Sequence, residues 1–395
     1  MPQRDDCGCG GLVTPTLDEL LAVAHSKPLP RLRVRERRPP PASVGAGMRG
    51  WMRWGLIDRA GREVRGGEGP NLILDQGLDL IATTSLLLQQ GNVGVPPTFF
   101  PLVRYCAVGT DSTAPDASDT GLGSELSRTD ATHAPDEFSR PSDGVYRITR
   151  HIEFDYAVAN GNLTEVGFSP TASAGGNLFN RLLFLDGLGT PEVVTKTSSE
   201  KLRIAYTLEV TLSPTAWTAG AFTITGVGVV NGDYRLIGGS APSGPSERCR
   251  APDLLLFSAW ARGGLGGVDG TILQPTSGVS HVSATDLSGV SYAADVNKTS
   301  DVVEAVVARA TTARDAYVAD SFQRTGGSWQ WDTTYGNLAP IRGFYAQGSA
   351  ESYNSGIYLC GKVGYAFDLD VGDEFAKDDE HTLTVGVPTV SWGRA

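Results

Sequence analysis

The chain has few of the residues that hold metal ions or form disulfide frameworks. It has five cysteines and five histidines in 395 residues, with no Cys-x-x-Cys pair and no His-x-x-x-His or Cys-His grouping. A structural zinc site needs four such ligands, and a disulfide framework uses an even, clustered set of cysteines. The sequence therefore predicts no metal, no cofactor and assembly in a reducing compartment.

Long apolar runs are also missing. The longest helical apolar stretch near the N-terminus, residues 20–24, is far shorter than the ~20 residues that span a bilayer. No apolar core of a secretory signal is present there either. We therefore expect a soluble protein with no membrane partner and no export signal of its own.

Signatures of catalysis are absent or incomplete. The sequence has no Gly-x-Ser-x-Gly elbow, and residues 356–362 fit a phosphate-binding loop except that Val363 stands where a Ser or Thr must hold magnesium. Glu153 and Asp155 point to one side of a predicted strand, as any alternating polar face does. The acidic residues of 368–380 depart from the spacing of a calcium-binding loop. We therefore predict that the protein is not an enzyme.

Charge is unevenly distributed along the chain. The 33 basic and 44 acidic side chains give a net charge of −11, but residues 1–65 carry 12 basic and 7 acidic side chains. The other residues carry 21 basic and 37 acidic side chains, so a leader of net +5 precedes a body of net −16. Because a nucleic acid must be met by clustered cations, this balance argues against nucleic acid as the main partner.

Residues 1–50 are predicted to form an extended anchoring arm that begins with a short helix. Thr16 and Glu19 can form a capping box, and the helix after Thr16 has one small apolar face made by Leu17, Leu20 and Leu21. The prolines that follow favour an extended chain. Two interpretations stay open: a solvated linker, or an arm laid across a neighbouring acidic subunit. The basic residues of this arm are Arg31, Arg33, Arg35, Arg37 and Arg38.

The remainder is predicted to be mainly β, an antiparallel β-sandwich-like body with one short helix. Apolar and polar residues alternate in residues 147–158 and, without exception, in residues 201–212, so each is a strand with one buried face. Asn160-Gly161 and Asn231-Gly232 are two-residue hairpin signals, because both central residues of such turns need positive φ. They predict that residues 162–169 and 234–237 return antiparallel to the strands before them.

Turn and boundary signals divide the body further. Residues 54–64 are predicted to form a hairpin with a turn at residues 58–61, followed by a helix between residues 75 and 90. The segment 238–251, rich in Gly, Pro and Ser, is the best candidate boundary. It separates a β-rich domain, residues 51–240, from residues 254–395, which are a second β-rich domain or the completion of the first. Further strands are predicted at residues 301–310, 357–367 and 382–392.

An aromatic cluster near residue 330 is the candidate binding surface of the body. Trp329 and Trp331 are two residues apart and therefore share one face, with Tyr335 close by in the sequence. Such rings can stack on a glycan, but packing in a core or in a subunit interface is more usual for such a pair.

A spaced pattern of residues runs from the first hairpin to residue 128. It consists of an Asn, a Gly-Leu helix, a strand ending in Val-Gly-Thr, a Thr-x-Pro loop and an Asp-Thr-x-Leu-x-x-Glu-x-x-Arg segment. The residues at these places are Asn71, Gly77, Leu78, Val108, Gly109, Thr110, Thr113, Pro115, Asp119, Thr120, Leu122, Glu125 and Arg128. This pattern resembles virion structural proteins of tailed bacteriophages, of the tail-fibre or baseplate-adaptor kind.

The resemblance implies a tail-associated structural protein of the virion, assembled in the cytoplasm of a host bacterium. Such a protein would bind other virion structural proteins through its N-terminal arm and would form a homo-oligomer, with a trimer favoured, through its β body. Two other functions stay open. The protein is alternatively a capsid decoration protein, or a glycan-binding receptor protein of the virion that uses the aromatic cluster.

Overall fold

The computed structural model describes most of the chain between residue 39 and the C-terminus, and these residues belong to one unit, residues 39–395. The described residues are 39–83, 101–239, 251–263, 280–283, 287–288, 290–293, 310–331, 333, 340–347, 350–353, 356–359 and 363–395. The following predicted residues lie outside them: Leu17, Leu20, Leu21, Arg31, Arg33, Arg35, Arg37, Arg38 and Tyr335.

Antiparallel sheets dominate the described residues, so the predicted mainly β fold class is confirmed. The larger sheet has eleven strands. Nine of them follow in the order β4 (Glu125–Thr129), β3 (Tyr105–Gly109), β8 (Glu165–Ser169), β9 (Asn180–Leu183), β2 (Glu63–Ile73), β1 (Ser43–Ile57), β11 (Lys201–Ser213), β6 (Val145–Phe154) and β5 (Glu137–Ser142). The other two are β23 (Thr389–Arg394), which pairs with β1, and β16 (Gln323–Arg324), which pairs with β23.

A second sheet has eight strands. Their order is β14 (Ser280–Ser283), β18 (Gly343–Gln347), β21 (Val363–Leu369), β13 (Gly228–Leu236), β12 (Thr218–Ile224), β22 (Leu383–Gly386), β17 (Gly326–Trp331) and β15 (Ala310–Arg314). Two small sheets pair β7 (Gly161–Leu163) with β10 (Val194–Lys196), and β19 (Ala350–Tyr353) with β20 (Gly356–Leu359). Sheet membership crosses the segment 238–251, since β12 and β13 pair with β22 and β21, and β23 returns to the larger sheet.

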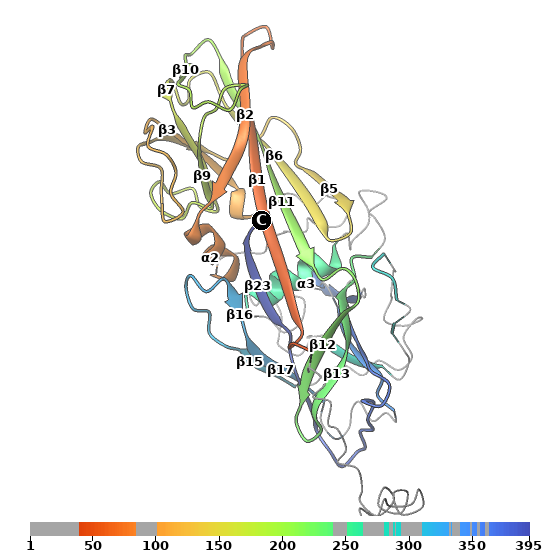
Figure 1. Cartoon of the computed structure of the whole chain (residues 1–395). Coiled ribbons are helices and arrows are strands. Elements are labelled where there is room, and N and C mark those ends of the chain that lie inside the picture. Colours follow the sequence, from red (N-terminus) through yellow and green to blue (C-terminus); the bar gives the residue numbers. More distant parts are fainter. Residues whose placement is uncertain are drawn as a thin grey trace, which may run out of the picture. The chain divides into compact units, whose positions relative to one another are not determined.

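The long strands β1, β11 and β6 lie side by side in the larger sheet (Figure 1). The alternation predicted for residues 201–212 is confirmed, because six apolar side chains of β11 are buried on one face. Burying a side chain of this size contributes roughly 1.5–3 kcal/mol, so this face makes β11 a central part of the core. The six buried residues are Leu202, Ile204, Tyr206, Leu208, Val210 and Leu212.

Strand β1 begins earlier than the sequence indicates. Residues 43–50, which we assigned to the arm, form its first half and pair with β11 on one side and β23 on the other. The last residue of the chain closes the arrangement, since the Ala395 amide donates to the Met48 carbonyl at 2.9 Å. The predicted arm boundary at residue 50 therefore lies inside a central strand.

The predicted hairpin and helix after β1 are confirmed. The Gly61 amide donates to the Asp58 carbonyl at 3.0 Å in the turn between β1 and β2, and Gly61 has a φ of 80°. Helix α2 spans Asp75–Thr83, and the rest of its predicted range lies outside the described residues. A short 3-10 helix, η1, spans Pro101–Val103.

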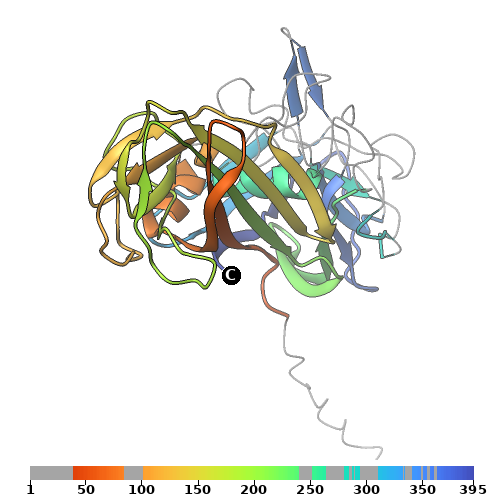
Figure 2. The same ribbon diagram turned by 90° about the horizontal axis from the view of Figure 1, so that it is seen from above.

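A second helix, α3 (Pro252–Ala261), was not identified from the sequence. Its described side chains include buried residues on all sides, as in a helix enclosed within a core. It packs against β21 and β18 of one sheet and against β23 and β16 of the other. The view from above shows α3, in teal, among these strands (Figure 2).

Both Asn-Gly hairpin predictions are wrong. The chain leaves β6 at a turn over residues 155–158 and does not return along β6, because β8 pairs with β3 and β9. Lys196 holds this turn by donating to the Asp155 carbonyl and to Asn160 Oδ1. In the second case the turn lies at residues 225–227, and Gly232 stands inside β13, where a Cβ would lie 2.0 Å from the Asp368 carbonyl oxygen. Gly232 therefore allows β13 and β21 to lie close together and does not form a turn.

Three other strand predictions need correction. Residues 357–367 contribute to two strands of different sheets, β20 and β21. Residues 382–392 likewise form β22 and β23, and Pro388 between them has no amide to continue a ladder. The strand predicted at residues 147–158 ends at Phe154, and Val158 is 38% exposed. Of the strand predicted at residues 301–310, only Ala310 is described.

Candidate functional site

The loop between β3 and β4 folds around the buried side chain of Arg181. This guanidinium is 4% exposed and donates to three carboxylates. Its Nε donates to Glu165 at 2.9 Å, its Nη1 to Asp119 at 2.6 Å and its Nη2 to Asp111 at 3.1 Å. The second contact of Nη2 is the Thr113 carbonyl, also at 3.1 Å. Asp119 and Thr113 are residues of the pattern that resembles phage virion proteins, so this part of the pattern shapes a loop.

Glu165 is the centre of the same cluster and is fully buried. Three backbone amides donate to its carboxylate, from Ser124 at 2.8 Å, Gly123 at 3.0 Å and Asp111 at 3.3 Å. These donors and Arg181 satisfy a charge that burial would otherwise make costly. Hydrogen bonds from the Thr113 amide and hydroxyl, together with Arg181, hold the pKa of Asp111 below its ordinary value. The charged groups of the cluster are therefore paired with one another.

Two further residues of the pattern pair with each other. Arg128 donates to both oxygens of Glu125, at 2.9 and 2.8 Å, and to the Thr171 carbonyl at 2.8 Å. Both side chains are largely buried, with exposed fractions of 5% and 12%. The charged residues of the pattern thus all make internal contacts, which is the behaviour of an architectural motif.

The predicted aromatic cluster lies in the core. Trp329 and Trp331 share one face of β17, as expected, but both are 0% exposed. Their rings lie 6.3 Å from Trp260 and 6.1 Å from Phe344, respectively. These indoles present no ring face on which a glycan could stack.

The carboxylates of Glu153 and Asp155 are both paired with cationic side chains. Glu153 accepts from Lys201 at 2.7 Å and from Arg203 at 2.8 Å, and Asp155 lies 3.2 Å from Lys201. Burial alone would raise the pKa of Glu153, but the hydrogen bonds from Lys201 and Arg203 outweigh it and hold that pKa below its ordinary value. Neither group is placed to act as a proton donor.

Two of the acidic residues in segment 368–380 also hold parts of the fold together. Asp368 accepts from the Leu287 amide at 2.7 Å, and Asp373 accepts from the Asn231 amide at 2.6 Å. Among the described residues, no group of three or more His, Cys, Asp or Glu side chains is arranged to hold a metal ion. The helices of the described residues are also too short or too polar to cross a membrane.

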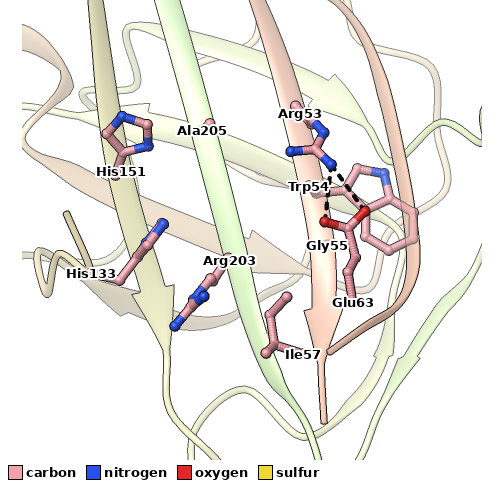
Figure 3. A pocket seen from close by; sticks show the side chains of 9 residues that line it. All are labelled: Arg53, Trp54, Gly55, Ile57, Glu63, His133, His151, Arg203 and Ala205. Atoms are coloured by element: carbon pink, nitrogen blue, oxygen red, sulfur yellow. Dashed lines mark hydrogen bonds and ion pairs between the residues drawn. The ribbon is translucent and has the colours of Figure 1, made fainter. Parts of the chain in front are cut away.

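The polar face of the larger sheet carries a pocket of about 250 Å³ (Figure 3). Strand register places Arg53 of β1, Ala205 of β11 and His151 of β6 in one row across the sheet. The next row on this face contains Gly55, Arg203 and Glu153. Because Ala205 and Gly55 have little or no side chain, a hollow remains between the long side chains that flank them.

Cations and imidazoles surround this hollow. Arg53 donates to both oxygens of Glu63, at 3.1 and 3.0 Å. The ring of His151 lies 5.4 Å from that of His133, edge to face. Partial burial, Arg203 and His151 lower the pKa of His133. The arginine nitrogens that do not contact Glu63 or Glu153, and the imidazoles, are donors that an anion in this hollow could accept from.

Sequence reasoning placed residue 151 only within the strand predicted at residues 147–158 and did not find the pocket. Arg53, Ala205 and His151 come from three strands that are far apart in the sequence. No local pattern reports which residues of such strands lie opposite each other. Comparisons of this chain with protein-family models, with curated proteins and with solved structures found no match.

Proposed function

We propose that this protein is a structural component of a tailed-phage virion, associated with the tail as a fibre or baseplate-adaptor protein. The observation that carries the proposal is the set of contacts made by the charged residues of the pattern in residues 71–128. These residues, Asp119, Glu125 and Arg128, all form ion pairs with other side chains of the same chain. A motif used in this way maintains a shape, which supports an architectural role over a chemical one.

The start of the described chain supports attachment through the N-terminal arm. The Ala42 amide donates to the Ala221 carbonyl at 3.1 Å, and the Ala221 amide donates to the Pro40 carbonyl at 3.0 Å. The arm therefore joins β1 at a point held to β12, and β1 is paired along its length with β11. Tension on a docked arm would be carried by many ladder hydrogen bonds loaded together. Self-association of the β body, as a trimer, would add valency to this attachment.

Light scattering tests the proposal on the full chain and on a chain of residues 39–395. The cut must precede Pro39, because removal of residues 1–50 would also delete half of β1. We expect a trimer in both forms, and we expect only the full chain to bind purified tail structures. Monomers in both forms, together with no binding to tails, would contradict the proposal.

The two alternative functions are separated by different measurements. A capsid decoration protein would bind shells instead of tails, so the same binding assay with purified capsids distinguishes it. A glycan-binding receptor protein would need a surface other than Trp329 and Trp331, since both are 0% exposed. Binding of the intact protein to host-surface polysaccharide would favour that function.

A further inference from the structure

The polar face of the larger sheet contains a row that shows how a carboxylate fits between two cations. Glu209 of β11 lies between Arg49 of β1 and Arg147 of β6 in the strand register. Arg49 Nη2 is 2.6 Å from Glu209 Oε1, and Arg147 Nε is 2.5 Å from Glu209 Oε2. One carboxylate at the centre of a row therefore bridges side chains from both flanking strands.

The row of Arg53, Ala205 and His151, which lines the pocket, has cationic or basic residues on its two outer strands but no carboxylate on its central strand. On the outer strands, Arg53 corresponds to Arg49 and His151 corresponds to Arg147. On the central strand, Ala205 corresponds to Glu209. One further row of the same face lies between the two rows. Adjacent strands lie about 4.8 Å apart, so the flanking strands are separated by roughly 10 Å in both rows. Glu209 spans that separation in its row, and none of the described side chains spans it above Ala205.

Donors remain available around the empty centre. Arg53 uses only Nη2 toward Glu63, and Arg203 uses only Nε toward Glu153, among the contacts of the described residues. Each arginine is paired with one glutamate, Glu63 or Glu153, and its other nitrogens are left to donate to a ligand. Guanidinium groups bind carboxylate, sulfate and phosphate oxygens well because their donors lie in one plane.

We propose that this pocket binds a small oxyanion, of the carboxylate or sulfate class, above Ala205 and between Arg53 and His151. The oxyanion takes the place that the Glu209 carboxylate has in its own row. Arg203 and the imidazole of His133 close the other side of the hollow (Figure 3). This inference does not depend on the proposed virion function.

Protonation of the His133 imidazole couples binding to pH. His151 faces Glu137 at 3.2 Å and the ring of His133, and Asp136 also lies in its electrostatic environment. His133 faces Arg203, His151 and Glu153, and the cations among these disfavour its charged form. A bound oxyanion offsets that repulsion, so the oxyanion and the protons favour each other's binding.

Titration calorimetry with sulfate tests the proposal, because sulfate keeps its charge between pH 5.5 and 7.5. Imidazoles gain protons as the pH falls, so we expect sulfate to bind severalfold more tightly at pH 5.5 than at pH 7.5. Ala205→Glu should abolish binding by supplying an internal carboxylate. Ala174→Glu, on an exposed loop outside the pocket, adds the same charge and should keep the affinity of the original chain.

A second readout does not depend on the folding of the Ala205→Glu variant. In the original chain with labelled histidines, sulfate should shift the imidazole NMR signals of His133 and His151. The signal of His381, which lies against Asp378, serves as the internal reference. Arg53→Gln, at an exposed position, should weaken binding severalfold.

The oxyanion is either a free ion or an acidic side chain of a second copy of this chain. Light scattering at pH 5.5, with and without sulfate, distinguishes the two. If an acidic side chain of a second copy fills the pocket, light scattering at pH 5.5 will show a larger mass that sulfate reduces. A free ion leaves the mass unchanged, and either result supports an oxyanion site. Absence of sulfate binding at pH 5.5, affinity independent of pH, or unchanged affinity in Ala205→Glu would overturn the proposal.

Discussion

Replacing Arg181 with methionine should destabilise the protein by about 3 kcal/mol. The substitution keeps much of the side-chain volume and removes the charge from a site that is 4% exposed. It leaves Glu165 fully buried without its cationic partner. Loss of one partner of a buried ion pair costs about 3–5 kcal/mol, because the other charge stays desolvated and uncompensated.

The lower end of that range applies for two structural reasons. Three backbone amides, those of Ser124, Gly123 and Asp111, continue to donate to Glu165 after the substitution. The other two carboxylate partners of Arg181 are 31% and 26% exposed, so water can solvate them once the guanidinium is gone. Partly exposed pairs of this kind contribute at most about 1 kcal/mol each.

Urea-induced unfolding followed by tryptophan fluorescence measures the effect. Arg62→Met removes an arginine that is 78% exposed and paired with Asp58, and it should change the free energy of unfolding by less than about 1 kcal/mol. Glu165→Gln combined with Arg181→Met completes a double-mutant cycle and isolates the coupling between the two side chains. A cost below about 1 kcal/mol for Arg181→Met would refute the idea that this cluster holds the loop.

Three further predictions concern the core and the charged face. Gly232→Ala should destabilise the protein by about 1–3 kcal/mol, because its Cβ would meet the Asp368 carbonyl at 2.0 Å; Gly393→Ala, with no atom within 4 Å, is the matched control in the same thermal-unfolding assay. Trp331→Ala should cost about 3–5 kcal/mol in urea unfolding, and unchanged stability would show that this ring is not in the core. Burial alone would raise the pKa of Glu209, but hydrogen bonds from Arg147 and Arg49 hold it below its ordinary value of 4.5. This residue therefore contributes stability above that value and loses it as the pH falls through the lower folded-state pKa; Glu209→Gln should reduce the slope of unfolding midpoints between pH 3 and 5, and an unchanged slope would contradict this.

The success of sequence reasoning varied with the range of the interactions involved. Strand β11 was predictable because its alternation is local and uninterrupted. Helix α3 was missed because an element buried on all sides has no polar face to reveal its period. The turn predicted at Asn231-Gly232 failed because a glycine is also required where two strands approach closely, and at Gly232 that need depends on a distant strand. In residues 147–158, Arg150 interrupts the apolar face but is buried there by its ion pair with Asp136 at 2.8 Å.

The candidate pocket depends on the core beneath it, which is why sequence alone did not identify it. Next to the row of Arg53, Ala205 and His151 lies a buried row in which Trp54, Ile204 and Ile152 stand opposite one another. A slip of one residue in any strand would move its apolar set to water and its polar set into the core. The apolar packing therefore fixes the register, and the register in turn sets the separation of the cations above Ala205. A change that loosens the buried row without altering any lining residue should weaken oxyanion binding along with stability.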